Sequence, residues 1–235
     1  VVTTLAGSSS GSTDATGTSA KFNQPWGIAT DGTNLYVADR ETHKIRKIVI
    51  STGVVTTLAG STSYGSTDAT GTSAKFNSPR GITTDGKNLY VGDYSNNKIR
   101  KIVIATGVVT TFAGSGSSGS ADGTGTAASF NNPMGIANDG TNLYVVDYNN
   151  HKIRKIFLRG TLTADVELHN LDDDTDAIVN LASSDTGEAT VSPATLTFTE
   201  DNWNTKQAVT LTGVDDNNTD GNKGYTISLS AADQV

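Results

Sequence analysis

Two acidic clusters in the last third of the chain contain the residues best suited to hold a metal ion. They comprise Asp172, Asp173, Asp174 and Asp176 in one stretch, and Asp215, Asp216 and Asp220 in another. Calcium takes roughly six to eight oxygen ligands, mostly carboxylates and carbonyls on flexible loops. Neither cluster has the spacing of an EF-hand loop. A weak calcium site and a solvated acidic surface therefore both remain open.

A basic motif, Lys-Ile-Arg-Lys-Ile, occurs three times. It supplies Lys44, Arg46, Lys47, Lys98, Arg100, Lys101, Lys152, Arg154 and Lys155. We favour a solvated strand edge, because exposed cations discourage pairing with another sheet. The alternative is a basic stripe that binds an anionic polymer or the acidic second half of the chain. We do not expect nucleic acid as a partner, since aromatic side chains for base stacking are not interleaved with the cations.

The histidines do not form a metal or catalytic site in the sequence. His43 and His151 occupy the same repeat position, and Asn97 stands there in the middle repeat, which is typical of a turn residue. A zinc site needs roughly three or four converging ligands. Without cysteine or a suitable pairing of Ser, His and Asp, the sequence predicts no catalytic residue and favours a non-enzymatic protein.

Two sets of aspartates also recur. Asp31 lies in an Asp-Gly turn and Asp39 ends a strand-like run, and both return in the other repeats. Asp at such positions accepts hydrogen bonds from its own turn, so we expect both sets to be structural. The alternative is a ring of carboxylates around a central ion in a closed ring of sheets.

The recurrent basic residues and aspartates lie on a sequence repeat that occurs three times. VVTTLAG at 1–7 returns at 54–60, and VVTTFAG follows at 108–114. Each repeat has four strand-like runs joined by short turns such as DGT and STG. In the first repeat the runs are 27–30, 34–39, 44–50 and 54–59. Four antiparallel strands repeated at this period predict propeller blades, with the long Ser/Gly/Thr-rich stretches as spacers.

Charge divides the chain in two. Residues 1–160 carry 15 basic and 10 acidic side chains, whereas residues 161–235 carry 2 and 14. Such asymmetry indicates a domain boundary, which we place between 159 and 160. Glycine contributes 25 residues, as expected for many turns between short strands. No apolar run is long enough to cross a bilayer, so we expect no membrane insertion.

The pattern PxGIAxDGxNLYVADxxxHKIRKI resembles the NHL repeat, the blade unit of a β-propeller family. Its residues here are Pro25, Gly27, Ile28, Asp31, Leu35, Tyr36, Val37, Asp39, Ile45 and their counterparts. The resemblance covers 1–159 and implies a binding platform more often than an enzyme, in a ring of about six blades. We therefore predict an all-β chain with a partial, three-blade NHL-type propeller, half of a six-bladed ring. The blades are expected at about 22–60, 76–114 and 130–159, with 1–7 as a strand of a preceding blade.

Three four-stranded sheets cannot close a ring and would expose apolar faces. We expect further repeats before residue 1 to complete it, and other copies of the chain are the alternative.

The acidic module at 160–235 is predicted to be a β-sandwich. Alternation in 194–203, 206–214 and 224–231 indicates strands with one apolar face. The expected core is Phe198, Trp203, Val209, Leu211, Tyr225 and Ile227. The module resembles immunoglobulin-like sandwiches of the Calx-β type, on Leu196-Thr197-Phe198, Trp203-Asn204 and Gly213-Val214-Asp215-Asp216. This resemblance implies calcium ligands in loops, at Asp215 and Asp216.

These features favour a secreted or cell-surface scaffold without catalytic activity. The propeller is expected to bind a protein or an anionic polysaccharide, and the acidic module to act as a spacer or calcium-binding link. One alternative is a structural subunit of an extracellular fibre or surface layer, built from further copies of the chain. Another is a metal-dependent lyase or lactonase on a six-bladed propeller. The near-identity of the repeats favours repeated binding over one asymmetric active site.

Overall fold

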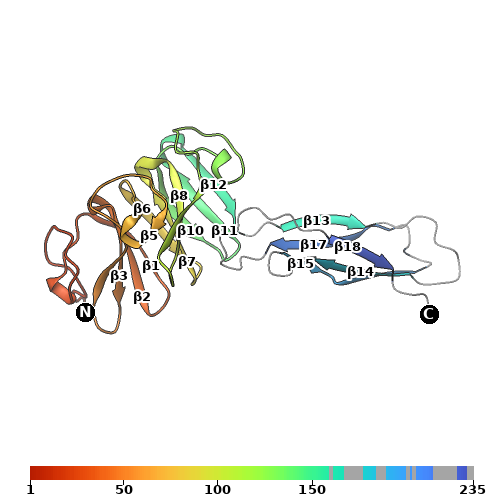
Figure 1. Cartoon of the computed structure of the whole chain (residues 1–235), viewed down its shortest axis with the longest axis horizontal. Helices are drawn as coiled ribbons and strands as arrows, with labels where there is room; N and C mark the ends of the chain where they lie inside the picture. Colours follow the sequence, from red (N-terminus) through yellow and green to blue (C-terminus); the bar gives the residue numbers. More distant parts are fainter. Residues whose placement is uncertain are drawn as a thin grey trace. The chain divides into compact units, whose positions relative to one another are not determined.

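The computed structural model shows an all-β chain in two compact units, Val1–Ile156 and Phe157–Val235 (Figure 1). The structure describes residues 1–158, 161–166, 177–183, 189–199, 202, 205–213 and 227–231. Within these residues the only helices are short 3-10 turns, and none is long and apolar enough to cross a membrane.

Three antiparallel sheets make up the first unit. The first sheet has the order β1 (Pro25–Thr30), β2 (Asn34–Asp39), β3 (Lys44–Val49) and β4 (Val55–Gly60). The second has the order β5 (Ala69–Thr70), β9 (Val108–Ala113), β8 (Lys98–Val103), β7 (Asn88–Asp93) and β6 (Pro79–Thr84). The third contains β10 (Pro133–Asn138), β11 (Asn142–Asp147) and β12 (Lys152–Phe157). The predicted runs of the first repeat match its strands to within two residues.

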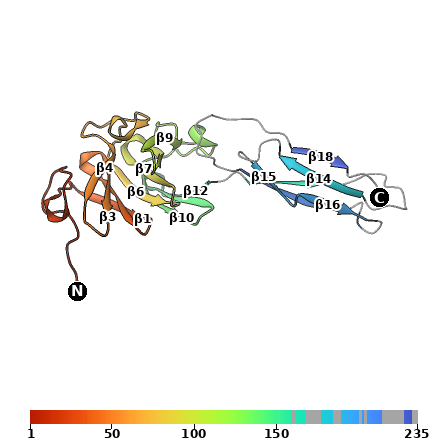
Figure 2. The same ribbon diagram turned by 60° about the horizontal axis from the view of Figure 1, so that its bottom comes forward.

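Neighbouring sheets pack through their first strands, because β6 lies between β1 and β10 (Figure 2). The core between the first two sheets includes Tyr36 and Ile45 from one side and Ile82 and Leu89 from the other. A second core joins the next pair of sheets, with Phe130 fully covered. The first two sheets thus bury apolar side chains against the sheet that follows each of them.

The turn between the first two strands explains the recurrent Asp-Gly pair. The Asp31 carboxylate accepts the backbone N–H groups of Thr33 at 2.9 Å and Asn34 at 2.6 Å. Gly32 has φ +87°, a left-handed conformation that glycine adopts without strain. Tyr36 donates its hydroxyl to the same carboxylate at 2.7 Å. The Asx-turn interpretation of Asp31, Asp85 and Asp139 is therefore confirmed.

Val1–Gly7 was predicted to be a strand, and it is not one in the structure. The identical residues 54–60 contain β4, which pairs with β3, the strand that precedes it in the chain. Residues 1–7 pair with no strand among the described residues, so they lack the edge that β3 gives to β4. Leu5 and Ala6 nevertheless lead into the same loop geometry, and the Gly7 N–H binds the Gly17 carbonyl at 3.1 Å.

The second unit contains two three-stranded antiparallel sheets. One consists of β13 (Thr161–Val166), β17 (Gln207–Gly213) and β15 (Ala189–Ser192). The other consists of β16 (Thr195–Phe198), β14 (Ala177–Ser183) and β18 (Ile227–Ala231). Val179, Phe198 and Leu211 belong to one apolar cluster that draws on both sheets. The predicted core positions Phe198, Val209 and Leu211 are buried, while Trp203, Tyr225 and the Ile227 side chain lie outside the described residues.

Candidate functional site

The arginines of the predicted basic stripe are not on a solvated edge. Arg46 and Arg100 are fully buried, so neither can contact a partner, and this part of the prediction is wrong. The Arg46 guanidinium forms ion pairs with Asp39 at 3.0 Å and Asp14 at 2.6 Å. Alternation along β3 places Arg46 on the face opposite Ile45, where the loop that contains Thr13 and Lys21 covers it. A buried guanidinium requires paired carboxylates. The lysines that flank the arginines remain partly or fully exposed.

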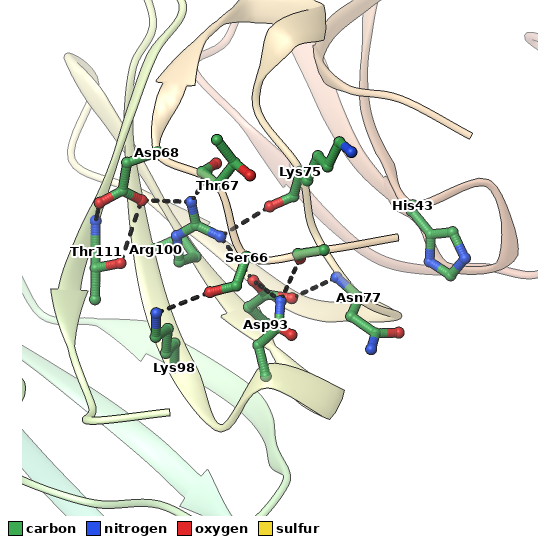
Figure 3. A network of polar contacts seen from close by, with 12 residues as sticks. His43, Ser66, Thr67, Asp68, Lys75, Asn77, Asp93, Lys98, Arg100 and Thr111 are labelled. Carbon is green, nitrogen blue, oxygen red and sulfur yellow. Dashed lines mark hydrogen bonds and ion pairs between the residues drawn. The ribbon is translucent and has the colours of Figure 1, made fainter. Parts of the chain in front are cut away.

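The second repeat has the same network (Figure 3). Arg100 pairs with Asp93 at 2.8 Å and with Asp68, and it donates to the Lys75 and Thr67 carbonyls at 3.0 Å each. The Asp68 carboxylate also accepts the Thr111 N–H of β9 at 2.9 Å. Arg100 therefore binds the end of β7 and the preceding loop directly, and it reaches β9 through Asp68.

The Ser/Gly/Thr-rich stretches were predicted to be structural spacers, and the expectation that they contain no strand is wrong for the second of them. Residues 69–70 of the second stretch form β5, which pairs with the outermost long strand of the second sheet, β9. Each stretch also provides the exposed aspartate of its network, namely Asp14, Asp68 or Asp122. These loops are thus structural parts of the sheets that follow them.

Asp39, Asp93 and Asp147 were predicted to cap their own turns, and the structure corrects this. Each carboxylate is fully buried and accepts a backbone N–H from a residue 16 positions earlier, such as Asn77 for Asp93. The second carboxylate oxygen pairs with the repeat's arginine. This carboxylate holds the chain segment before the first strand onto the sheet.

Burial raises the pKa of Asp93 to about 6, although Arg100 and the hydrogen bonds oppose this rise. The folded chain then binds a proton between about pH 6 and pH 4 that the unfolded chain does not. We expect Asp93 to add about 1 kcal/mol to the free energy of unfolding from pH 7 to pH 5, while the lowered pKa of His43 acts in the opposite direction. Below pH 4 stability should fall, because the hydrogen-bonded Asp85 has a lowered pKa despite its burial.

Thermal unfolding from pH 7 to pH 3 tests this pH profile. The Asp93→Asn variant should lose the contribution of Asp93 between pH 7 and pH 5, keep that of Asp39, and keep the decline below pH 4. An equal change in Tm from pH 7 to pH 5 for the wild type and the Asp93→Asn variant would contradict the prediction.

The repeat position of His43, Asn97 and His151 is a turn position, as predicted. All three residues have left-handed backbone angles, with φ between 55° and 57°. The structure adds a role at the joints between sheets. The Ser78 N–H donates to His43 Nδ1 at 3.1 Å, and the Asn132 N–H donates to Asn97 Oδ1 at 2.9 Å. Burial lowers the pKa of His43, which favours the neutral ring that can accept this bond.

A cluster of arginine and aromatic side chains is the strongest candidate for a binding site. The Arg80 guanidinium lies over the rings of Tyr94 and Trp26, 3.4 Å and 4.8 Å from their centroids. Arg40 lies over the same Trp26 ring at 5.9 Å. Tyr148 is close enough to influence the Arg80 charge. The cluster therefore draws on all three sheets, at the end where β1 and β6 begin.

Arg80 is unusual among the buried or half-buried arginines of the first unit. Within residues 1–158 it alone has no carboxylate partner. Its buried Nε has no hydrogen-bond acceptor, which is also true of Arg40 and Arg100. Burial and the nearby Arg40 lower its pKa from the ordinary value. Trp26 is 49% exposed and Tyr148 is 51% exposed, so the cluster offers open aromatic surface beside a cation that lacks a counter-ion.

Sequence analysis missed this cluster, although the repeats contain a signal for it. The Lys-Ile-Arg-Lys-Ile motif is identical in all three repeats, whereas one position changes from Trp26 to Arg80 to Met134. A second changes from Arg40 to Tyr94 and Tyr148. Both positions lie at the same end of the sheets, because Pro25 pairs with Asp39.

The predicted calcium ligands cannot be placed, because all seven aspartates lie outside the described residues. His169 lies outside them as well. In the part of the chain that the structure describes, no three His, Cys, Asp or Glu residues converge as a metal site would require.

Residues 22–48 match the NHL repeat family. NHL repeat-containing protein 2 from Bos taurus is 36% identical over 155 residues, which are 59% of this chain and 21% of that protein. The chain spans about a fifth of the length of the first curated relatives that it matches.

Two solved structures resemble the fold. An auxiliary nutrient binding protein from Bacteroides ovatus superposes with a TM-score of 0.51 at 27% identity, over 59% of this chain and 38% of that one. A protein of the same description from Bacteroides thetaiotaomicron gives 0.50 at 26% identity, over 55% and 36%. Together with the sheets described above, these matches identify the chain as an all-β protein that carries an NHL repeat on a propeller-like framework.

Proposed function

We propose that the first unit is a non-catalytic binding platform for an acidic polysaccharide, held at the cluster of Trp26, Arg40, Arg80, Tyr94 and Tyr148. The observation that carries this proposal is the Arg80 guanidinium, which lies over two aromatic rings without a carboxylate partner in residues 1–158. A ligand carboxylate would supply the missing counter-ion. Charge-assisted bonds of this kind are among the strong ones, and arginine suits planar carboxylates.

The exposed rings give the second part of the recognition. Trp26 and Tyr148 each expose about half of their surface. Open aromatic rings supply large, rigid contact area for the apolar face of a ligand. A polymer that alternates apolar faces with carboxylates, such as a chain of uronic acids, fits both features. The nutrient-binding description of the two similar Bacteroides structures supports a binding role.

We also propose where the protein acts and what its second unit does. Acidic polysaccharides of this kind are met outside the cell, which agrees with the expected secreted or cell-surface location. The acidic second unit would then serve as a spacer or a calcium-binding link, on the aspartates named above. The alternative of a metal-dependent lyase or lactonase has no supporting metal cluster in the described residues.

Titration calorimetry with oligogalacturonate in low salt tests the binding function. Wild-type protein should bind it and should not bind a neutral oligosaccharide of equal length. The Arg80→Gln variant should weaken binding by about tenfold to a hundredfold, because it removes a charge-assisted hydrogen bond to the ligand.

Lys87→Gln is the matched control for this experiment. It also removes one positive charge, at an exposed turn near the opposite end of the second sheet, and should bind like the wild type. Equal weakening by both variants would show that only overall charge matters. That result, or no binding by the wild type, would refute the proposed site.

A further inference from the structure

Each of the three sheets has a glycine in its first strand at which a strand of the next sheet can pack closely. We call this position a socket, and the third sheet has one as well. Gly27 has room only for a hydrogen, because a Cβ there would collide with the Arg80 carbonyl of the next sheet. Gly81 faces the Met134 carbonyl in the same way. Gly135 is the counterpart on the third sheet, and only Val146 of its own sheet lies near it. Among the described residues, no strand fills this third socket.

Apolar side chains show the same pattern at both ends of the first unit. Ile45 is fully buried against the second sheet, whereas its counterpart Ile153 is 70% exposed. Tyr144 is 36% exposed, although the equivalent tyrosines are buried. On the opposite side, Ile28 is 61% exposed and its counterpart Ile82 only 6%. The two ends therefore expose the two complementary faces of one joint.

The hydrogen bond of the joint is open at both ends as well. His43 and Asn97 each accept the backbone N–H of a residue 35 positions later. His151 is the counterpart acceptor, and it is exposed. Gln24 is the counterpart donor and has the same left-handed backbone, with φ 55°. Within residues 1–158 its N–H has no acceptor.

The third sheet also lacks a fourth strand. In the described residues β12 pairs only with β11, whereas β3 and β8 each pair with a further strand. Val1–Gly7 has the sequence of β4 and forms no strand of its own. Val2 is 99% exposed, but its counterpart Val55 is 1% exposed. One end of the unit thus lacks a strand that the other end supplies.

Asp122 gives an independent sign of the missing strand. Asp14 accepts both the N–H and the hydroxyl of Thr57 on the fourth strand, at 2.9 Å and 3.1 Å. Asp122 binds Arg154 at 2.6 Å, but no threonine contacts it among the described residues, and its side chain is 94% exposed. Thr4 is the counterpart of Thr57 in the sequence VVTT.

We propose that the third sheet binds a second copy of this chain. Residues 1–7 of that copy add to β12 as its fourth strand, and its β1 packs against β10 and the Gly135 socket. The register between β3 and β4 transfers directly, so Ile153 pairs with Ala6 and Arg154 with Thr4. Thr4 then donates to Asp122. This surface does not depend on the polysaccharide proposal.

The second copy is the favoured occupant because the chain itself carries each missing part. The strand, the donor N–H and the apolar face are all present at the opposite end of the same unit. Such a contact joins unlike surfaces head to tail, and it forms a ring when the rotation between copies closes.

Light scattering on the full chain after size-exclusion chromatography tests the assembly. The wild type should have a mass of at least two chains of 24.3 kDa. Thr4→Pro removes the N–H for Asp122, and Ile153→Lys places a charge on the exposed apolar face. Each should raise the dissociation constant at least about tenfold. Both positions are exposed, so the protomer should keep its circular dichroism spectrum.

Ser9→Pro and Ile50→Lys are the matched controls, at exposed positions outside the proposed contact. They should assemble like the wild type. A wild-type mass of one chain at about 100 µM would overturn the proposal. So would an assembly that neither Thr4→Pro nor Ile153→Lys weakens.

An engineered disulfide between copies identifies which surfaces meet, because the chain has no cysteine of its own that would react. Ala6→Cys combined with Ile153→Cys should give reducible multimers on oxidation, because the two residues are strand partners in the proposed register. Thr52→Cys combined with Ile153→Cys should not. Equal cross-linking of both pairs would refute the register and the proposed surface.

Discussion

Replacing Arg100 by leucine is expected to lower the free energy of unfolding of the first unit by about 3–5 kcal/mol. The substitution leaves the fully buried Asp93 carboxylate without its cation, only 2.8 Å from where the guanidinium had been. It also leaves the Thr67 and Lys75 carbonyls without their donor. Hydrogen exchange of β6 to β9 in urea measures the loss for this unit separately from the second one.

Two variants sharpen the test of Arg100. Arg154→Leu changes the same repeat position where the side chain is 10% exposed, so solvent should reduce the loss. Asp93→Asn combined with Arg100→Leu removes the unpaired charge and should recover part of the stability. A loss below about 1 kcal/mol for Arg100→Leu would contradict the role of this network.

Replacing Gly81 by alanine is expected to be the second severe change. The new Cβ would collide with the Met134 carbonyl and crowd the Ile136 backbone nitrogen at 2.9 Å. These atoms belong to the backbone of β10, which cannot move aside as a flexible side chain could. Overpacking of this kind typically costs roughly 1–3 kcal/mol, and we expect the upper part of that range.

Gly135→Ala provides the matched comparison for Gly81→Ala. Only the Val146 side chain lies near its Cβ position, at 3.2 Å, so the single protomer should lose much less stability. The comparison should be made by thermal unfolding at a protein concentration where the chain is monomeric. Equal destabilisation by the two variants would show that strand-to-strand contact is not the reason for glycine here.

The strands of the repeats were predictable because their signals are local. Alternating apolar residues in NLYVAD and the Asp-Gly turn before it depend on neighbours a few residues apart. The Asp31 network shows this well, since each of its partners lies within five residues. Here short-range chemistry and the final structure agree.

The ion-pair networks were not predictable, because their partners are far apart in the chain. Asp14 meets Arg46 across 32 residues, and only the folded loop brings them together. The strand pattern alone did not distinguish an inward arginine from an exposed one, and we took the stripe to be solvated. The cluster at Arg80 needed three sheets in place, since its rings come from separate repeats.

The strand prediction for residues 1–7 failed for a related reason. VVTTLAG at 54–60 contains a strand, because β3 provides an edge with which it pairs. The identical sequence at 1–7 forms no strand. β-structure depends on a partner strand, so identical sequence can have two outcomes.

Residues 69–70 belong to the loop that leaves the first sheet, yet they pair with the last strand of the second sheet. This connection is therefore fastened to the far edge of the sheet that it introduces. Under a pulling force, the second sheet cannot lose β9 without also releasing the linker that precedes it. We expect single-molecule pulling to release linker and sheet together, in steps of about one repeat length. The same fastening explains how gene duplication could lengthen such a protein, because one copied segment brings both a sheet and its own clasp.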